Sequence, residues 1–287
     1  MHLVIPHAGA PEGLDLPPLP HLAALLGPLR PAQKLGSDEY SLDTPLEQFL
    51  AQARGEAPAV AAWLAADQGL DASRPWALLT PLHMAVSTDQ VTAYGPESLQ
   101  LSDDESRNYF DSLGELWPAS EGWESHHVSS DAWLVSHASL AGLSAASLDR
   151  VVQRSVEPWM PEPRRLRTLQ NEVQMLLHRH PLNETRSLPL NSVWISGCGA
   201  STRPLPAEIR VDQRLREPLL AGDWASWLKG WQALDAELPA LAPTRITLCG
   251  ERFAQTYEAG AAPGLLPSLW RKLTPPRADT TAALNAL

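Results

Sequence analysis

The sequence has little of what defines several common classes of protein. It contains two cysteines, Cys198 and Cys249, which are too few for a disulfide framework and show no metal-binding spacing. No apolar run reaches the roughly 18 residues that a transmembrane helix needs. The first apolar stretch, Leu3 to Ile5, is too short for a signal peptide and lacks a basic flank. These absences lead us to expect a soluble, cytoplasmic protein with no membrane partner.

Basic residues are also scarce, because 22 lysines and arginines stand against 33 aspartates and glutamates, for a net charge of −11. A nucleic-acid-binding surface needs a basic stripe, so this balance argues against a nucleic acid as partner. The cluster Arg164, Arg165 and Arg167 follows Glu162 and is typical of a solvated helix start. The sequence also has no P-loop, G-x-G-x-x-G, H-E-x-x-H or G-x-S-x-G motif.

What the sequence does contain is enough apolar material for a sizeable core, with 44% hydrophobic and 19% charged residues. Alternating or continuous apolar runs predict strands at residues 2–6, 76–86, 90–94, 123–128, 132–137, 192–196 and 244–249. Helices are expected to begin at the capping boxes of Thr44 and Ser102, to cover residues 60–66 and 167–180, and to follow Asp223. Strands alternate with helices near both ends of the chain, which favours an α/β fold. We predict a core sheet with flanking helices from residues 1–86 and 161–287, and an inserted small α+β domain at 87–160.

Two loops attract attention as ligand sites. Gly197-Cys198-Gly199 follows a predicted strand, where glycines let backbone amides approach a ligand, although a tight turn explains them as well. Gly36-Ser37-Asp38 lies in a polar loop, where Ser37 is either a turn residue or, with metal ions or a base beside it, a nucleophile. The pairs His126-His127 and His178/His180 are not natural chelates, because their side chains do not share a face.

The stretch His180-Pro181-Leu182-Asn183, then Arg186, then Pro189 to Gly199 resembles a motif of the archaeal-type cofactor-independent phosphoglycerate mutases, of the alkaline phosphatase superfamily. Leu101 to Ser106 is similar to a helix start in that family's inserted domain. Gly36-Ser37-Asp38 falls where the family has its phosphoryl-accepting serine, and Gly222-Asp223 with Lys229 and Asp235 resembles a family helix. Residues 166–175 and the later N-S-x-W-x-S-G-C-G also resemble proteobacterial regulatory proteins of RpfE type. The resemblance implies an alkaline-phosphatase-like core.

The sequence departs from the family at the ligands for two divalent metals. In place of the aspartate after the first strand it has Pro6-His7-Ala8-Gly9, and no histidine precedes Gly222-Asp223. The late strand ends in Cys249-Gly250-Glu251-Arg252 instead of D-H. Because two-metal phosphoryl transfer requires those ligands, Ser37 is left as a weak nucleophile and no metal or cofactor is expected.

Our preferred hypothesis is therefore a non-catalytic relative that regulates or senses a small anionic ligand. That ligand would bind at His7, Asp38, Asn183, Arg186, Asn191, Gly197, Cys198 and Gly199, with Arg186 as the natural partner of an anion. One alternative is a phosphoester-processing enzyme, a mutase or phosphatase, that uses Ser37 with His7 or Asp38. A second is a structural protein that docks its Trp-rich helix, Trp224 to Trp231, onto a protein partner, although the same helix could simply cover the sheet.

Overall fold

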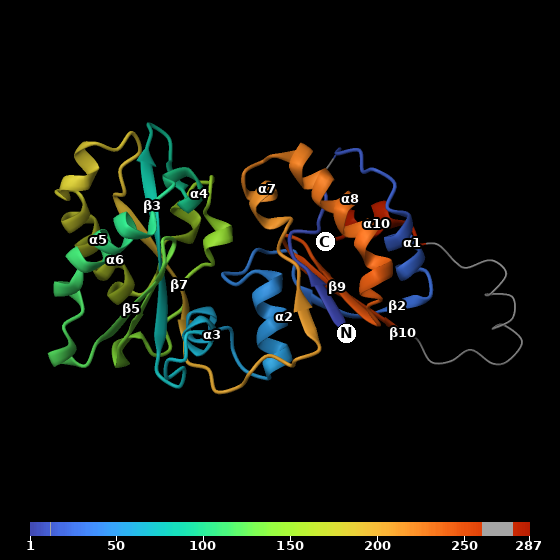
Figure 1. Cartoon of the computed structure of the whole chain (residues 1–287), viewed down its shortest axis with the longest axis horizontal. Helices are drawn as coiled ribbons and strands as arrows, with labels where there is room; N and C mark the ends of the chain where they lie inside the picture. The colour runs from blue at the N-terminus through green and yellow to red at the C-terminus, as the bar shows by residue number, and fades with distance from the viewer. Residues whose placement is uncertain (12, 260–277) are drawn as a thin grey trace, which may run out of the picture. The chain divides into compact units, whose positions relative to one another are not determined.

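The computed structural model describes residues 1–11, 13–259 and 278–287. They form a mixed α/β protein with two five-stranded sheets and flanking helices, which confirms the predicted fold class. The chain divides into two compact units, and each is described by itself (Figure 1). Unit 1 contains residues 1–41 and 205–287, and unit 2 contains residues 42–204. No helix among the described residues is long and apolar enough to cross a membrane.

Unit 1 is built on a sheet of strand order β2-β10-β9-β1-β8. Its elements are β1 (His2–Ile5), α1 (Pro20–Leu26), β2 (Leu29–Gly36), β8 (Ile209–Val211), α7 (Arg216–Leu220), α8 (Trp224–Leu241), β9 (Arg245–Cys249), β10 (Phe253–Ala259) and α10 (Thr280–Asn285). β1 pairs in parallel with β8 and β9, whereas β10 runs antiparallel to β9 and β2. The sheet therefore joins strands from the two ends of the sequence.

The core of unit 1 lies between the sheet and helices α1 and α8. Trp227 and Trp231 of α8 are fully buried there and pack with Leu3, Ile5 and other apolar side chains. Trp224 of the same helix is 38% exposed. Most of the Trp-rich stripe thus covers the sheet, and two of the three tryptophans on which the docking alternative relied are core residues.

Unit 2 is built on an antiparallel sheet in which β3 pairs with β4, β6 and β7, and β6 also pairs with β5. Its strands are β3 (Trp76–Val86), β4 (Val91–Tyr94), β5 (Glu124–Ser129), β6 (Ala132–Ser136) and β7 (Ser192–Gly199). Its helices are α2 (Pro45–Arg54), α3 (Val60–Asp67), α4 (Pro96–Leu99), α5 (Asp103–Ser112) and α6 (Arg164–Leu177), with short 3-10 turns between them. The capping boxes predicted at Thr44 and Ser102 are both formed.

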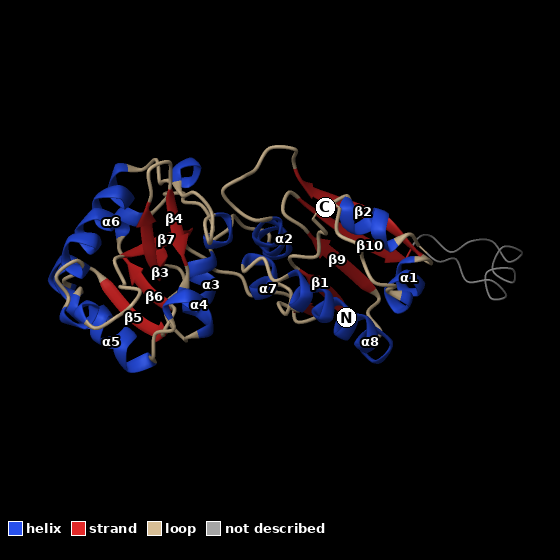
Figure 2. Cartoon of the chain, turned by 90° about the horizontal axis from the view of Figure 1, so that it is seen from above, coloured by secondary structure: helices blue, strands red, loops and turns tan. Residues whose placement is uncertain are grey.

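Helices cover both faces of the sheet of unit 2 (Figure 2). Helices α5 and α6 pack on the face that carries Ala77 and Leu79 of β3. Helix α3 packs on the opposite face, against Trp76 and Leu78. Alternate residues of β3 therefore contribute to two apolar clusters, which explains why this strand reads as an almost continuous apolar run.

The division into units differs from the predicted one. The prediction joined residues 42–86 and 161–204 to the terminal segments and kept 87–160 apart, whereas all three segments form unit 2. The physical reason is the pairing of β3, because Leu79 lies opposite Trp133 of β6 on one side and Ile195 of β7 on the other. Such pairing over more than 50 residues has no local sequence signal.

Candidate functional site

The residues predicted to form a ligand site fall into different units. His7, Ser37 and Asp38 belong to unit 1, and Asn183, Arg186, Asn191 and the loop 197–199 belong to unit 2. Each residue is therefore described by the contacts that it makes within its own unit.

Asn183 fastens the loop that follows α6. Its Oδ1 accepts hydrogen bonds from the Tyr109 hydroxyl at 2.7 Å and from the Leu190 amide at 2.9 Å. Its Nδ2 donates to the carbonyls of Leu177 at 2.8 Å and Leu190 at 2.7 Å. Since these four bonds use both donors and both acceptor positions of the amide, Asn183 serves the loop rather than a ligand.

Arg186 is likewise engaged within unit 2. Its Nη1 lies 2.8 Å from Oε1 of Glu105, Nη2 donates to the Leu99 carbonyl, and Nε donates to the Leu188 carbonyl at 3.3 Å. Hydrogen bonds from Ser102 and the charge of Arg186 hold the pKa of Glu105 below its usual value. The guanidinium predicted to receive an anionic ligand therefore ties the α5 start to the loop before β7.

Asn191 extends the pairing of β3 with its side chain. Its Oδ1 accepts from the Met84 amide at 2.7 Å, and its Nδ2 donates to the Met84 carbonyl at 2.9 Å. The side-chain amide thus makes the same pair of hydrogen bonds to the backbone of β3 that one further residue of a paired strand would make. Asn191 also lines the cavity described below.

The loop Gly197-Cys198-Gly199 lies against the start of α3. Gly197 has φ +60°, and a Cβ there would lie 2.9 Å from the Ala61 nitrogen. A Cβ on Gly199 would lie 2.8 Å from Cβ of Ala59. Burial raises the pKa of the Cys198 thiol to about 12, so it is protonated and unreactive at neutral pH. Close packing of strand on helix accounts for both glycines.

Of the residues predicted in unit 1, Ser37 and Asp38 lie in the loop after β2, and His7 lies in the loop after β1. The Ser37 hydroxyl donates to the Glu39 carbonyl at 2.7 Å and is exposed. The Asp38 carbonyl accepts from Arg252 at 3.4 Å. His7 adopts φ +58°, and its carbonyl accepts a hydrogen bond from Nε1 of Trp227 at 2.9 Å. Among the described residues, no group of three or more His, Cys, Asp or Glu side chains is placed to hold a metal ion.

One buried polar cluster escaped the sequence analysis. Oγ of Ser106 lies 3.1 Å from Nε2 of His127 and receives a hydrogen bond from Nε1 of Trp133 at 2.9 Å. Asp103 lies 4.0 Å from the other ring nitrogen of His127, so the order Ser, His, Asp is that of a hydrolase triad. Ser106 is fully buried, however, and a substrate could not reach its hydroxyl. The hydrogen bonds of this cluster satisfy Oγ of Ser106 and Nε1 of Trp133 in the core, while Nδ1 of His127 has no hydrogen-bond partner in the described part of the chain.

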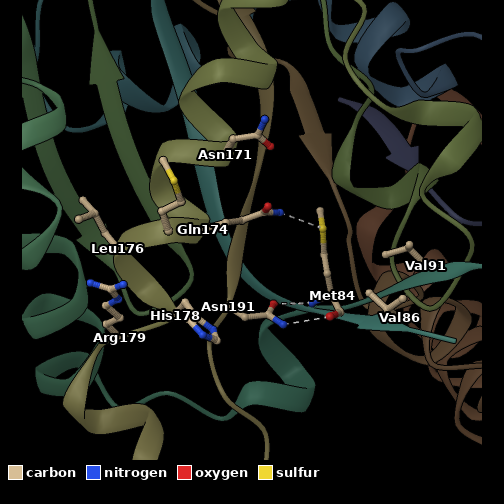
Figure 3. Close-up of a pocket in the computed structure, with 10 residues that line it drawn as sticks. Met84, Val86, Val91, Asn171, Gln174, Leu176, His178, Arg179 and Asn191 are labelled. Carbon is tan, nitrogen blue, oxygen red and sulfur yellow. Dashed lines mark hydrogen bonds between the residues drawn. The ribbon is translucent and has the colours of Figure 1, made fainter.

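One hollow in the surface of unit 2 is a cavity of about 980 Å³ between the β3–β4 hairpin and α6 (Figure 3). It is lined by Met84, Val86, Val91, Asn171, Gln174, Met175, Leu176, His178, Arg179 and Asn191. Val86 is 81% exposed and Met175 is 65% exposed, which is unusual for apolar side chains of their size. Cavities of this volume with apolar walls and a few polar groups are typical of small-molecule sites.

Polar groups of the cavity come from α6 and from the residues that follow it. Gln174 donates to Oγ of Ser192 at 3.0 Å and contacts the sulfur of Met84 at 3.4 Å (Figure 3). His178 and Arg179 are exposed just beyond the helix. Sequence reasoning found only Asn191 of this set. Met175 offered a signal for the cavity in the sequence, because it is an apolar residue that lies outside the apolar stripe of its helix.

Comparisons with known proteins add a distant structural similarity. No family model matches the sequence, and no curated protein is significantly similar to it. The structure is similar to that of a cofactor-independent phosphoglycerate mutase from Thermoplasma acidophilum DSM 1728, with 11% sequence identity and a TM-score of 0.36, over 91% of this chain and 90% of the other. At that identity and TM-score the similarity assigns neither a family nor an activity to this chain.

Proposed function

We propose that the protein is a non-catalytic binding protein with a sensing or regulatory role, and that its ligand occupies the cavity between the β3–β4 hairpin and α6. The observation that carries this proposal is the cavity itself, which combines exposed apolar walls with basic side chains at one end. Asn183 and Arg186 were predicted to bind the ligand, but their side chains are bonded within unit 2. We therefore place the ligand in the cavity instead.

The ligand that fits this lining is a small organic acid with an apolar body. Met84 and Met175 provide adaptable apolar surface, because methionine is flexible and polarisable. Arg179 provides a fixed positive charge and several donors for an acidic group. The chain as a whole carries a net charge of −11, which does not attract an anion. The attraction would come from the positive charge of Arg179 at the cavity, which acts over a short distance.

The proposal is tested with an apolar anionic dye, 1-anilinonaphthalene-8-sulfonate, whose fluorescence rises on transfer to an apolar site. We expect one dye per chain, and about tenfold weaker binding in Arg179→Glu, because one ion pair is replaced by a repulsion. The control is Arg164→Glu at the other end of α6, which makes the same change in net charge outside the cavity. Equal loss in both variants would show that the dye responds only to overall charge.

The alternative of a phosphoester-processing enzyme has one observation in its favour, the exposed hydroxyl of Ser37 beside Asp38. It is tested by mutase and phosphatase assays of the purified protein with added Mn²⁺. We expect no turnover, since a serine hydroxyl needs a base or metal ions to become a nucleophile. Turnover that disappears in Ser37→Ala would replace the binding proposal with the enzymatic one.

A further inference from the structure

Unit 1 has an edge at which three loops converge. β1 and β9 pair in parallel, with Ile5 opposite Leu248, so the loops that follow both strands emerge side by side. β10 begins where β9 ends, and its Phe253 pairs with Gly36 at the end of β2. The carboxyl ends of parallel strands are where α/β sheets usually bind ligands. The surface at residues 7–10, 36–38 and 250–253 is hereafter called the carboxyl edge.

The described segment 278–287, which contains α10, occupies part of this carboxyl edge. The Leu287 carbonyl oxygen accepts hydrogen bonds from the amides of Arg252 at 3.2 Å and Phe253 at 2.9 Å. The Ala10 amide donates to the Leu284 carbonyl at 3.3 Å. These loop amides thus hold the backbone of segment 278–287 at the carboxyl edge.

Two glycines make this contact feasible. A Cβ on Gly250 would lie 2.4 Å from Cβ of Leu287 and 2.8 Å from its carbonyl carbon. A Cβ on Gly9 would lie 3.3 Å from Cα of Gly250 and 3.5 Å from Cβ of Leu287. Since any side chain at residue 250 would collide with Leu287, glycine at this position makes room for the backbone and Cβ of residue 287.

The segment is attached by few side chains. Leu284 is fully buried in the apolar cluster of unit 1, and Leu287 packs against the same cluster. Ala278 and Ala283 also pack against this cluster, whereas Thr281, Ala282 and Asn285 are exposed. The two largest apolar side chains of the segment are therefore leucines three positions apart, and the backbone oxygen of the second is bound by two amides.

We propose that the carboxyl edge of unit 1 is a binding site for a peptide segment of the pattern Leu-x-x-Leu, and that residues 284–287 of the chain itself occupy it as an internal ligand. A peptide of the same pattern competes with this segment for the amides of Arg252 and Phe253. The site is separate from the cavity of unit 2 and does not depend on the function proposed for that cavity.

The first experiment weakens the internal ligand and supplies a peptide in its place. In the full chain, Leu284→Asp puts a charge at the buried anchor, and a fluorescein-labelled peptide of residues Asp279–Leu287 is titrated in. We expect binding to this variant at least about tenfold tighter than to the unchanged chain, whose site is filled. The control peptide carries serine in place of both leucines and should not bind. Equal binding of the two peptides would overturn the proposal.

Hydrogen exchange separates release of the segment from unfolding of unit 1. In Leu284→Asp we expect the amides of Ala10, Arg252 and Phe253 to exchange about tenfold faster or more, and to regain protection on addition of the peptide. Amides inside β1 and β9 should keep their protection. If they lose it together with the loop amides, residues 284–287 are an inseparable part of the core and the proposal is wrong.

A second variant perturbs the site from the other side. Gly250→Ala leaves Leu284 unchanged, and φ at residue 250 is not in the left-handed region, so its effect comes from the contact with Leu287 alone. It should speed exchange at Arg252 and Phe253, and it should also abolish peptide binding when combined with Leu284→Asp. Gly114→Ala, where a Cβ would meet open space, is the control. Peptide binding that survives Gly250→Ala would place the peptide elsewhere.

Discussion

The two units use polar loop residues in opposite ways. In unit 2, Asn183 uses both donors and both acceptor positions of its side chain, and Arg186 and Asn191 are bonded to the backbone or to a neighbouring side chain. In unit 1, Ser37 is exposed and its hydroxyl bonds only its own loop. The part of the sequence that most resembles a catalytic family is thus the part whose polar residues are structural. A motif can persist because the fold needs its hydrogen bonds.

The largest effect that tests this comparison is expected at Gly197. In Gly197→Ala the new Cβ meets α3 at 2.9 Å while φ stays at +60°, so we expect the free energy of unfolding to fall by about 3 to 4 kcal/mol. Gly69→Ala has a similar φ of +74° but open space around the Cβ, and should cost about 1 kcal/mol. Urea denaturation measures both. Equal losses would mean that strain alone, without helix packing, requires glycine at residue 197.

Next in size is the effect expected at Asn183. Asn183→Ala leaves the Tyr109 hydroxyl and the Leu190 amide without their acceptor, which should cost about 2 to 3 kcal/mol of unfolding free energy. Asn171→Ala on the exposed surface of α6 should cost less than about 0.5 kcal/mol. A loss of binding with unchanged stability in Asn183→Ala would instead make Asn183 a ligand-binding residue.

One buried group in each unit should make an opposite contribution to stability in acid. Burial lowers the pKa of His2 in unit 1 from 6.5 to about 4, so only the unfolded chain takes up this proton between those values and stability falls with the pH. Burial raises the pKa of Glu47 in unit 2 from 4.5 to about 7, so the folded chain holds this proton first and stability is lost as pH rises through that window. Each group contributes on the order of 2 kcal/mol.

Hydrogen exchange at pH 7 and pH 5 follows each unit by its own strand amides. We expect the difference between units to shrink in His2→Gln and in Glu47→Gln, because each substitution removes one titrating group. A pH response of β1 unchanged by His2→Gln, or of β3 unchanged by Glu47→Gln, would contradict the assignment.

The smallest effect is expected at Ser37. Ser37→Ala removes one exposed hydrogen bond to the Glu39 carbonyl, so thermal unfolding should shift by an amount equivalent to less than about 0.5 kcal/mol. A loss similar to that of Asn183→Ala would show that the loop of unit 1 is as structural as the motif of unit 2, and would remove the contrast between them.

Local signals in the sequence were predictive wherever the structure depends on neighbours along the chain. The capping boxes at Thr44 and Ser102, the apolar face of the helix through Val173 and the strand before Gly197 were all recognisable. Strand β2 was missed because Pro31 weakens its strand pattern, and the structure places it at the edge of the sheet, where proline is tolerated.

Features that depend on distant partners were not predictable in the same way. The role of Asn183 rests on Tyr109, which lies 74 positions earlier, and that of Asn191 on Met84, 107 positions earlier. The cavity was not predicted, because the β3–β4 hairpin and α6 are far apart in the sequence and come together only in the folded unit. Asn183, Arg186 and Asn191 of the site predicted from the motif make hydrogen bonds within unit 2, and Asn191 also lines the cavity. Their role as a ligand site stays a prediction.

The assembly of unit 1 from both ends of the sequence has a consequence for biosynthesis. Among the described residues, β1 pairs with β8 and β9, which lie more than 200 residues later. At about 5 to 20 residues per second, a ribosome takes roughly 10 to 40 seconds to make that stretch. Unit 2 is continuous and can fold while the emerging chain still carries an unpaired, apolar β1. Residues 1–41 are therefore the segment that nascent-chain chaperones should hold longest.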